Sequence, residues 1–288
     1  MKEQKNCIPQ LIIIYLLWGF NWVVMRSANT YFPPVLFVAL RFTIGAAVLL
    51  IFLAFTHKLV PPREFLPWMM ITGLMSMAGN NIIVQFTTIP LGSGVTAVLD
   101  YTMPLWTTLI AAAVLKEKLT LRKMAGVLIT LVGLVVLMNV SIKGNYGAAL
   151  LTICAAVIWA VSNILVKSKL KGCDMIQYTA WQMAAAAIGL DIFVLIFPQG
   201  PVDWQPMAIG ALLYNGLLAS AIAFVIWNYV LSNMEAGKAS VAMMAVPAVG
   251  VLAGIIVLGE PMNLNRAVGM AAIIAGIIIV LTNKEKKE

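Results

Sequence analysis

Long stretches without charged side chains constrain this chain more than any other feature of its sequence. Ten such windows of roughly 17–25 residues can each cross a hydrocarbon core of about 30 Å as a helix. Lipid offers no partner for backbone amides, and the windows lack the alternating pattern of barrel strands. We therefore predict an all-α polytopic membrane protein with ten transmembrane helices. Their approximate limits are 8–25, 34–56, 65–87, 92–114, 124–140, 146–166, 176–198, 206–230, 239–258 and 265–282.

The composition agrees with a location in the membrane. Only 10% of the residues are charged and 62% are hydrophobic, against about 25% and about 45–50% in soluble domains. Too few polar residues remain to cover a soluble surface. We expect the first window to be retained as a helix, because no small-residue cleavage pattern follows it.

The net charge of +8 is distributed as a topology signal. If the N-terminus is cytoplasmic, fifteen Lys and Arg residues lie on the inner side and three on the outer side. This bias predicts a cytoplasmic (inner) membrane protein whose two termini are both cytoplasmic. Because the charges are spread over short loops, nucleic acid is not expected as a partner.

One proline-containing span occurs twice. Residues 91–117 are apolar apart from Asp100 and the terminal charges, and residues 234–260 follow the same pattern 143 residues later. The matched pairs are Gly94 with Gly237, Pro104 with Pro247, and Glu117 with Glu260. Further matches follow at an offset of 141, among them Trp18 with Trp159, Asn21 with Ser162, and Arg41 with Gln182.

These matches divide the chain into two five-helix repeats, 1–143 and 144–288. Because five is odd, the second repeat enters the membrane with the opposite orientation. Such inverted repeats are typical of secondary transporters, whose substrate sites lie near the midplane between the halves.

Several motifs resemble the EamA family of the drug/metabolite transporter superfamily. They are WGFNWVVMRSA at 18–28, VALRF at 38–42, the doubled glycine–proline–glutamate unit, and paired glycines in the fifth and tenth windows. The resemblance covers nearly the whole chain. It implies a ten-helix inner-membrane carrier that works by alternating access and often exports amino acids or related metabolites. It specifies no substrate and supplies no role for Asp100.

Charged residues inside the windows are the first candidates for function, since each costs about 3 kcal/mol to insert. Arg41 and Asp100 are expected at similar depth, and their counterparts Gln182 and Met243 are both uncharged. Our hypothesis is that Arg41 and Asp100 form an ion pair or share the charged ends of one substrate. Alternatively, Arg41 reaches the headgroups and amides satisfy Asp100. Asp191, nearer a helix end, is expected to be structural.

Pro104 and Pro247 each remove one backbone hydrogen bond at mid-span. We predict a kink and a gating hinge at both, with ordinary helix curvature as the alternative. Asp100 and Tyr101 share a face with Pro104 by helical spacing. Asp100 is the only central acid and is therefore the candidate proton site.

Polar and aromatic side chains within the windows are candidates to line a transport pathway. Packing between helices is the alternative for each of them. Besides Arg41, Asp100 and Tyr101, the set comprises Trp18, Asn21, Asn81, Gln85, Trp159, Ser162, Gln182 and Asn228. Glu117 and Glu260, at helix ends beside basic residues, are expected to form solvated ion pairs.

No metal, cofactor or enzymatic activity is expected. His57 is the only histidine, and Cys7, Cys154 and Cys173 are dispersed. The sequence has no GxxxxGK[ST] motif for ATP and no Ser/His or Cys/His pair in one window.

The sequence thus predicts a secondary transporter that exports a small metabolite by alternating access, driven by the solute gradient or by exchange with protons. Two alternatives stay open: a facilitator or importer of another small solute, and a non-transporting membrane sensor or scaffold. The expected partners are a small-molecule substrate and the lipid bilayer. Whether the chain is a monomer or a homo-oligomer is undetermined.

Overall fold

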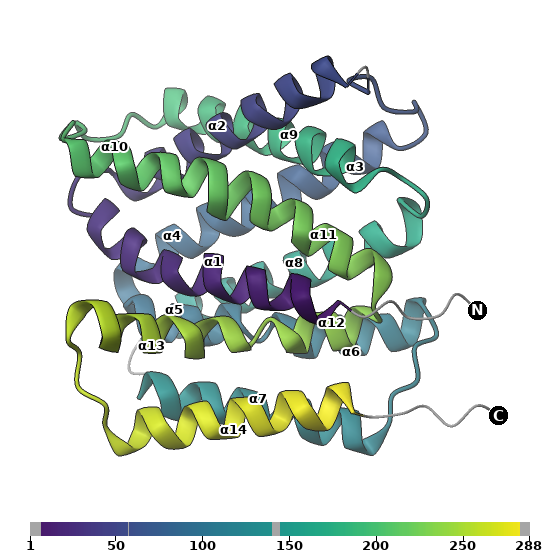
Figure 1. Ribbon diagram of the computed structural model, residues 1–288, viewed down its shortest axis with the longest axis vertical. Helices are drawn as coiled ribbons and strands as arrows, with labels where there is room; N and C mark the ends of the chain where they lie inside the picture. Colours follow the sequence, from purple (N-terminus) through teal and green to yellow (C-terminus); the bar gives the residue numbers. More distant parts are fainter. Residues whose placement is uncertain (1–6, 57, 140–144, 283–288) are drawn as a thin grey trace.

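The residues that the structure describes form a bundle of ten helical rods that run roughly side by side (Figure 1). The computed structural model describes residues 7–56, 58–139 and 145–282. Six rods are single helices: α1 (Ile8–Ala28), α2 (Pro34–Phe55), α7 (Leu121–Met138), α8 (Tyr146–Lys169), α9 (Met175–Ile196) and α14 (Leu264–Leu281).

The other four rods are interrupted. Two contain a π-helical segment: α3 (Leu66–Thr72), η1 (Gly73–Gly79) and α4 (Asn80–Leu91); then α10 (Pro206–Leu213), η2 (Tyr214–Ile222) and α11 (Ala223–Asn233). Two are broken by a short non-helical turn: α5 (Ser93–Asp100) with α6 (Met103–Val114), and α12 (Ala236–Ala242) with α13 (Ala245–Leu258).

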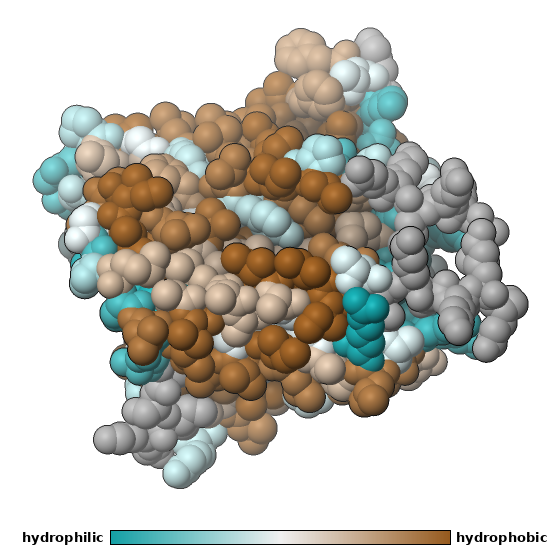
Figure 2. All heavy atoms as spheres, turned by 60° about the horizontal axis from the view of Figure 1, so that its bottom comes forward, coloured by the Kyte–Doolittle hydropathy of each residue, from teal (hydrophilic) through white to brown (hydrophobic). Residues whose placement is uncertain are grey.

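The rods have the dimensions and surface of membrane-spanning helices. Within the described residues, nine are long and apolar enough to cross a bilayer. The tenth, α3–η1–α4, carries Asn80, Asn81 and Gln85, whose amides lower its hydropathy. Hydrophobic residues cover the middle of the face in Figure 2, and polar residues gather toward its two ends. The prediction of an all-α, ten-helix membrane protein is confirmed.

The two ends of the described chain lie on the same side of the bundle. The start of α1 and the end of α14 are both on the right in Figure 1. We call this side the terminal face and the other side the opposite face. The boundary expected at 143/144 lies outside the described residues.

The packing of the rods follows the sequence repeat. Helix α1 packs on α13, and its repeat equivalent α8 packs on α6, the equivalent of α13. The equivalent helices α2 and α9 pack on each other, as do α7 and α14. Two copies of one unit in inverted orientation produce this exchange of partners.

The two π-helical segments were not predicted, and they lie at equivalent positions of the repeat. A Cβ on Gly73 in η1 would collide with the carbonyl oxygen of Gln182 in α9. A Cβ on Gly216 in η2 would lie 3.4 Å from the carbonyl oxygen of Arg41 in α2. Gly73 and Gly216 are 143 residues apart, and Arg41 and Gln182 are themselves repeat equivalents. The glycines therefore bring each π segment against the backbone of α9 or α2.

Glycines also bring α7 and α14 together, and substitution at Gly269 tests this contact. A Cβ there would lie 2.5 Å from the Leu137 amide nitrogen and 2.7 Å from the Gly133 carbonyl oxygen. Gly269→Ala should cost about 1–3 kcal/mol through overpacking and lower the apparent melting temperature in detergent. Gly210→Ala is the control, because a Cβ at that position would have no described atom within 4 Å. Equal melting temperatures for the two variants would contradict the prediction.

Candidate functional site

A cluster of four polar side chains joins α2, the α3–η1–α4 rod and α5 near the middle of the bundle. We call Arg41, Asn80, Asn81 and Asp100 the Asp100 cluster. Asn80 Nδ2 donates to Asp100 Oδ1 at 2.9 Å and to the Ala155 carbonyl oxygen at 3.2 Å. Arg41 Nη2 donates to Asn81 Oδ1 at 3.3 Å.

The ion pair expected between Arg41 and Asp100 is not formed within the described residues. Each charge bonds instead to one of two consecutive asparagines. Consecutive side chains on a helix point in directions about 100° apart, so Asn80 and Asn81 reach different neighbours. The Arg41 guanidinium carbon also lies 4.3 Å from the centre of the Phe42 ring, a cation–π contact. The two charges therefore stay apart.

Both charged groups keep unused hydrogen-bonding capacity. Arg41 Nε is buried and has no partner among the described residues. Among the described residues, the side chain of Asp100 accepts the recorded hydrogen bond at Oδ1. Its Oδ2 is therefore available as an acceptor. Arg41 and Asp100 are each half-buried. Arg41 Nε, a donor on a cation, and Asp100 Oδ2, an acceptor on an anion, are thus both available at similar depth in the bundle.

Asp100 also lies at a helix break. Helix α5 ends at Asp100 and α6 begins at Met103, with Pro104 in its first turn. The interruption expected from Pro104 is present, and α12 and α13 are separated likewise just before Pro247. Both prolines are buried. The carboxylate thus sits beside the negative, C-terminal end of α5, an arrangement that attracts a proton or a cation.

Two candidate pathway residues flank this cluster. Tyr101, half-buried, occupies the turn between α5 and α6. Gln85 is also half-buried and lies one helical turn beyond Asn81 in α4, so the two amides share a side of the rod.

A second polar cluster lies between α9, α11 and η1. Gln182 Nε2 donates to Ser76 Oγ at 3.3 Å, and Asn228 Nδ2 donates to Gln182 Oε1 at 3.2 Å and to Thr179 Oγ1 at 2.9 Å. Ser162 Oγ donates to the Thr72 carbonyl oxygen at 3.5 Å. Gln182, Asn228 and Ser162 are buried. Their hydrogen bonds join helices to each other, as the packing alternative expected.

The repeat-related tryptophans have different surroundings. Trp18 Nε1 donates to the Ala219 carbonyl oxygen at 2.8 Å, and its ring packs edge-on against Phe224. Trp159 packs against a buried cluster formed by Met103, Ala156 and Ala160, where α8 contacts α6. Asn21, one turn after Trp18, has a buried Oδ1 without a partner in the described residues. The structure therefore places Trp159 at the contact of α8 with α6, and Trp18 against η2 and α11.

Two other acids occupy positions that differ in exposure. Asp191 is bonded by Thr43 Oγ1 at 3.1 Å and is half-buried, apart from the Asp100 cluster. The expectation of a solvated ion pair at Glu117 is wrong, since its side chain is only 9% exposed. Its partner Lys123 and the adjoining loop from the second repeat cover it. Sequence reasoning missed Glu235, which approaches Lys123 only in the folded chain.

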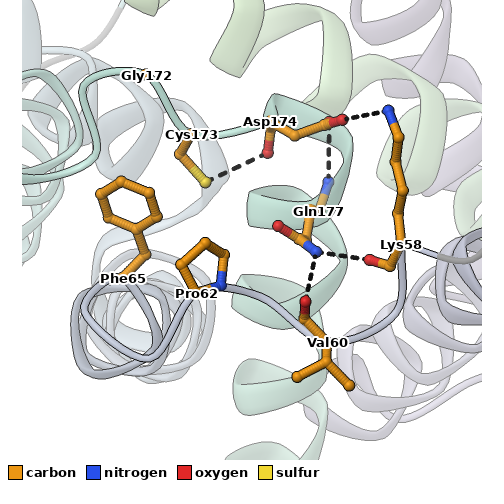
Figure 3. Close-up of a pocket in the computed structure, with 8 residues that line it drawn as sticks. All are labelled: Lys58, Val60, Pro62, Phe65, Gly172, Cys173, Asp174 and Gln177. Carbon is orange, nitrogen blue, oxygen red and sulfur yellow. Dashed lines mark hydrogen bonds and ion pairs between the residues drawn. The ribbon is translucent and has the colours of Figure 1, made fainter.

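A surface pocket of about 390 Å³ lies between the α2–α3 and α8–α9 loops (Figure 3). Gln177 Nε2 donates to the carbonyl oxygens of Lys58 and Val60, and Lys58 Nζ lies 3.4 Å from Asp174. Burial raises the pKa of the Cys173 thiol to about 11, with Asp174 adding to the shift. These groups bond mainly to one another, so the pocket is a clamp between loops and is separate from the Asp100 cluster.

Comparisons with known proteins agree with this architecture. The family model of the EamA-like transporter family matches residues 6–139 and again 147–282. The uncharacterized transporter YoaV of Bacillus subtilis is 34% identical, over 93% of this chain and 94% of its own. A probable amino-acid metabolite efflux pump of Salmonella typhimurium is 24% identical, over 97% and 95%.

Further similarities concern location and fold. The uncharacterized inner membrane transporter YedA of Escherichia coli is 27% identical, over 95% of this chain and 90% of its own. A crystal structure of another protein superposes with a TM-score of 0.82 at 21% identity, over 95% of each chain, and so shares the fold. On the doubled family match and the relative at 34% identity, this chain is a multi-pass membrane transporter that belongs to the EamA-like transporter family.

Proposed function

We propose that this protein exports a small zwitterionic metabolite, an amino acid or a related compound, across the cytoplasmic membrane. The observation that carries the proposal is the separation of Arg41 and Asp100, each with an unused hydrogen-bonding atom. A solute carboxylate would bind Arg41, and its ammonium group would bind Asp100. The relative named a probable amino-acid metabolite efflux pump supports this class of solute.

The depth of the two charges suits a solute held between the repeats. Arg41 lies seven residues after the start of α2, and Asp100 lies seven residues after the start of α5. At 1.5 Å per residue both are about 10 Å from the opposite face. Asn80 and Asn81 hold them at this level.

Competition at Asp100 would couple export to protons. The carboxylate can hold either a proton or the ammonium group of the solute, but not both. Proton entry from outside would then release the solute there, and loss of the proton inside would prepare the site again. We place the terminal face in the cytoplasm on the basis of the Lys and Arg distribution.

Substitution of the two charged residues tests the solute site. Asp100→Asn and Arg41→Gln should each lower export at least about tenfold, because a hydrogen bond to a charged group contributes about 1.5–3 kcal/mol. Metabolites in medium and cytoplasm are measured with each variant overproduced. Asp191→Asn is the control, since Asp191 lies outside the cluster, and should export normally. Undiminished export by both cluster variants would refute the site, and uptake without export would reverse the direction.

The pH dependence of export tests proton coupling separately. Export by the parent protein should depend on the transmembrane pH gradient, and residual export by Asp100→Asn should not. Flux is measured in vesicles with and without an imposed gradient. A gradient dependence that persists in Asp100→Asn would remove Asp100 as the proton site.

The two buried prolines are proposed as hinges, and replacing Pro104 tests one of them. Alanine restores an amide that can bond the Asp100 carbonyl oxygen and so extends α5 into α6. Pro104→Ala should slow export several-fold without weakening solute binding. Pro90→Ala, at an exposed proline inside α4, is the matched control. Equal export rates for the two variants would contradict a hinge at Pro104.

A further inference from the structure

We propose that two repeat-related ion clusters, one at each face of the bundle, are the gates of this carrier. The cluster at the terminal face is buried in this structure, and the ion pairs at the opposite face are partly exposed. The inference rests on the proposed transport by alternating access. It assigns a transport role to charged residues outside the Asp100 cluster.

The terminal cluster is a buried ion network that joins the two repeats. Lys123 Nζ lies 3.3 Å from Glu117 and 3.2 Å from Glu235, and Lys238 Nζ lies 2.8 Å from Glu235. The exposed fractions of the Lys123, Glu117 and Glu235 side chains are 2%, 9% and 14%. Glu117 and Lys123 belong to the first repeat, and Glu235 and Lys238 belong to the second.

Glu117 also fixes the start of the broken α12–α13 rod. Its Oε1 accepts from the Ala236 amide at 2.6 Å, and its Oε2 accepts from the Gly237 amide at 3.2 Å. The Lys167 amine donates to the Met234 carbonyl oxygen in the same loop. Every residue of α12 is buried. One carboxylate therefore holds the first turn of a rod from the other repeat against the bundle.

The opposite face carries three of these charges at equivalent positions, whereas Glu235 and Lys238 correspond to the uncharged Gly92 and Val95. An offset of 143 relates Glu117 to Glu260 and Lys123 to Arg266, and an offset of 141 relates Lys167 to Arg26. Glu260 lies 2.7 Å from Arg26 and 3.0 Å from Arg266. The side chains of Glu260, Arg266 and Arg26 are 26%, 24% and 70% exposed. The repeat thus preserves the pairs Glu117–Lys123 and Glu260–Arg266, and the structure buries the first more deeply than the second.

The contrast extends to the rods that these carboxylates face. Ala236 and Gly237, which Glu117 holds, correspond to Ser93 and Gly94 at the start of α5. Ser93 is exposed, whereas Ala236 is fully buried. The start of α5 is therefore less covered than the start of α12.

The second state of the carrier would have the opposite face closed by its ion cluster and the terminal face open. In inverted-repeat transporters the repeats move against each other around a central site. In the other state, Glu260 would accept from the Ser93 and Gly94 amides, with Arg266 in the place of Lys123. The terminal network would then separate and admit solvent. Because a buried network that loses one member leaves charges unpaired, its substitution should shift the balance between the two states.

The experiment measures which face gives access to Tyr101, beside Asp100. Tyr101→Cys is introduced after Cys7, Cys154 and Cys173 are replaced by serine. A membrane-impermeant thiol reagent is applied to vesicles of either orientation. In the Tyr101→Cys protein without substitutions in the clusters, labelling should come mainly from the opposite face. Equal or greater labelling from the terminal face would overturn the proposal.

Substitutions in the two clusters should change labelling in opposite directions. Glu117→Gln should raise labelling from the terminal face at least about tenfold, because its buried network loses a charge. Glu260→Gln should lower labelling from the terminal face, because it destabilises the state in which the opposite face is closed. Glu64→Gln is the matched control at an exposed glutamate on the terminal face and should change neither rate.

The outcomes separate a gate from a merely structural cluster. An unchanged labelling ratio in Glu117→Gln, or a shift of the same sign in Glu260→Gln, would overturn the inference. If Glu117→Gln does not accumulate, Lys238→Gln is used, because this variant keeps the Lys123 contacts. It should shift labelling toward the terminal face by a smaller factor than expected for Glu117→Gln. No shift would overturn the proposal. Labelling requires no solute. It therefore tests the role of the two clusters as gates even if the protein does not export zwitterions.

Discussion

Every polar atom inside the hydrocarbon layer must find its partner within the protein, because lipid supplies none. The ten rods satisfy this requirement for most of the backbone. The places where a helix breaks or a charge enters are then the places where other rods must compensate. Asn80 and Asn81 do so for Asp100 and Arg41, and the broken α5–α6 rod packs against α8 and α12.

The inverted repeat explains why the functional groups fall into two kinds. Groups found in both halves lie at rod ends and breaks: the two prolines, the two π segments, and the ion pairs Glu117–Lys123 and Glu260–Arg266. Arg41 and Asp100, by contrast, correspond to the uncharged Gln182 and Met243 of the other half. A scaffold that alternates needs equivalent parts at its two faces, whereas recognition of one solute requires no symmetry.

Sequence reasoning succeeded where the answer depends on local composition. Helix number, the rod breaks before Pro104 and Pro247, and the close packing of paired glycines follow from hydropathy, the missing proline amide and small side chains. It failed for contacts between rods. Arg41 and Asp100 have matching depth and opposite charge, yet each bonds an asparagine, because depth does not specify the angular position of a side chain around its helix. Glu117 was expected in solvent, but residues from the second repeat bury it.

The sequence by itself determined that this chain crosses the membrane as helices, that it contains two inverted copies of one unit, and that charge at mid-depth is confined to a few positions. Those properties depend on residue type and spacing along one helix. Only the tertiary structure decided which charges meet, which keep a hydrogen-bonding atom without a described partner, and which are buried. These depend on contacts between residues more than a hundred positions apart, such as Glu117 with Ala236, which no local pattern specifies.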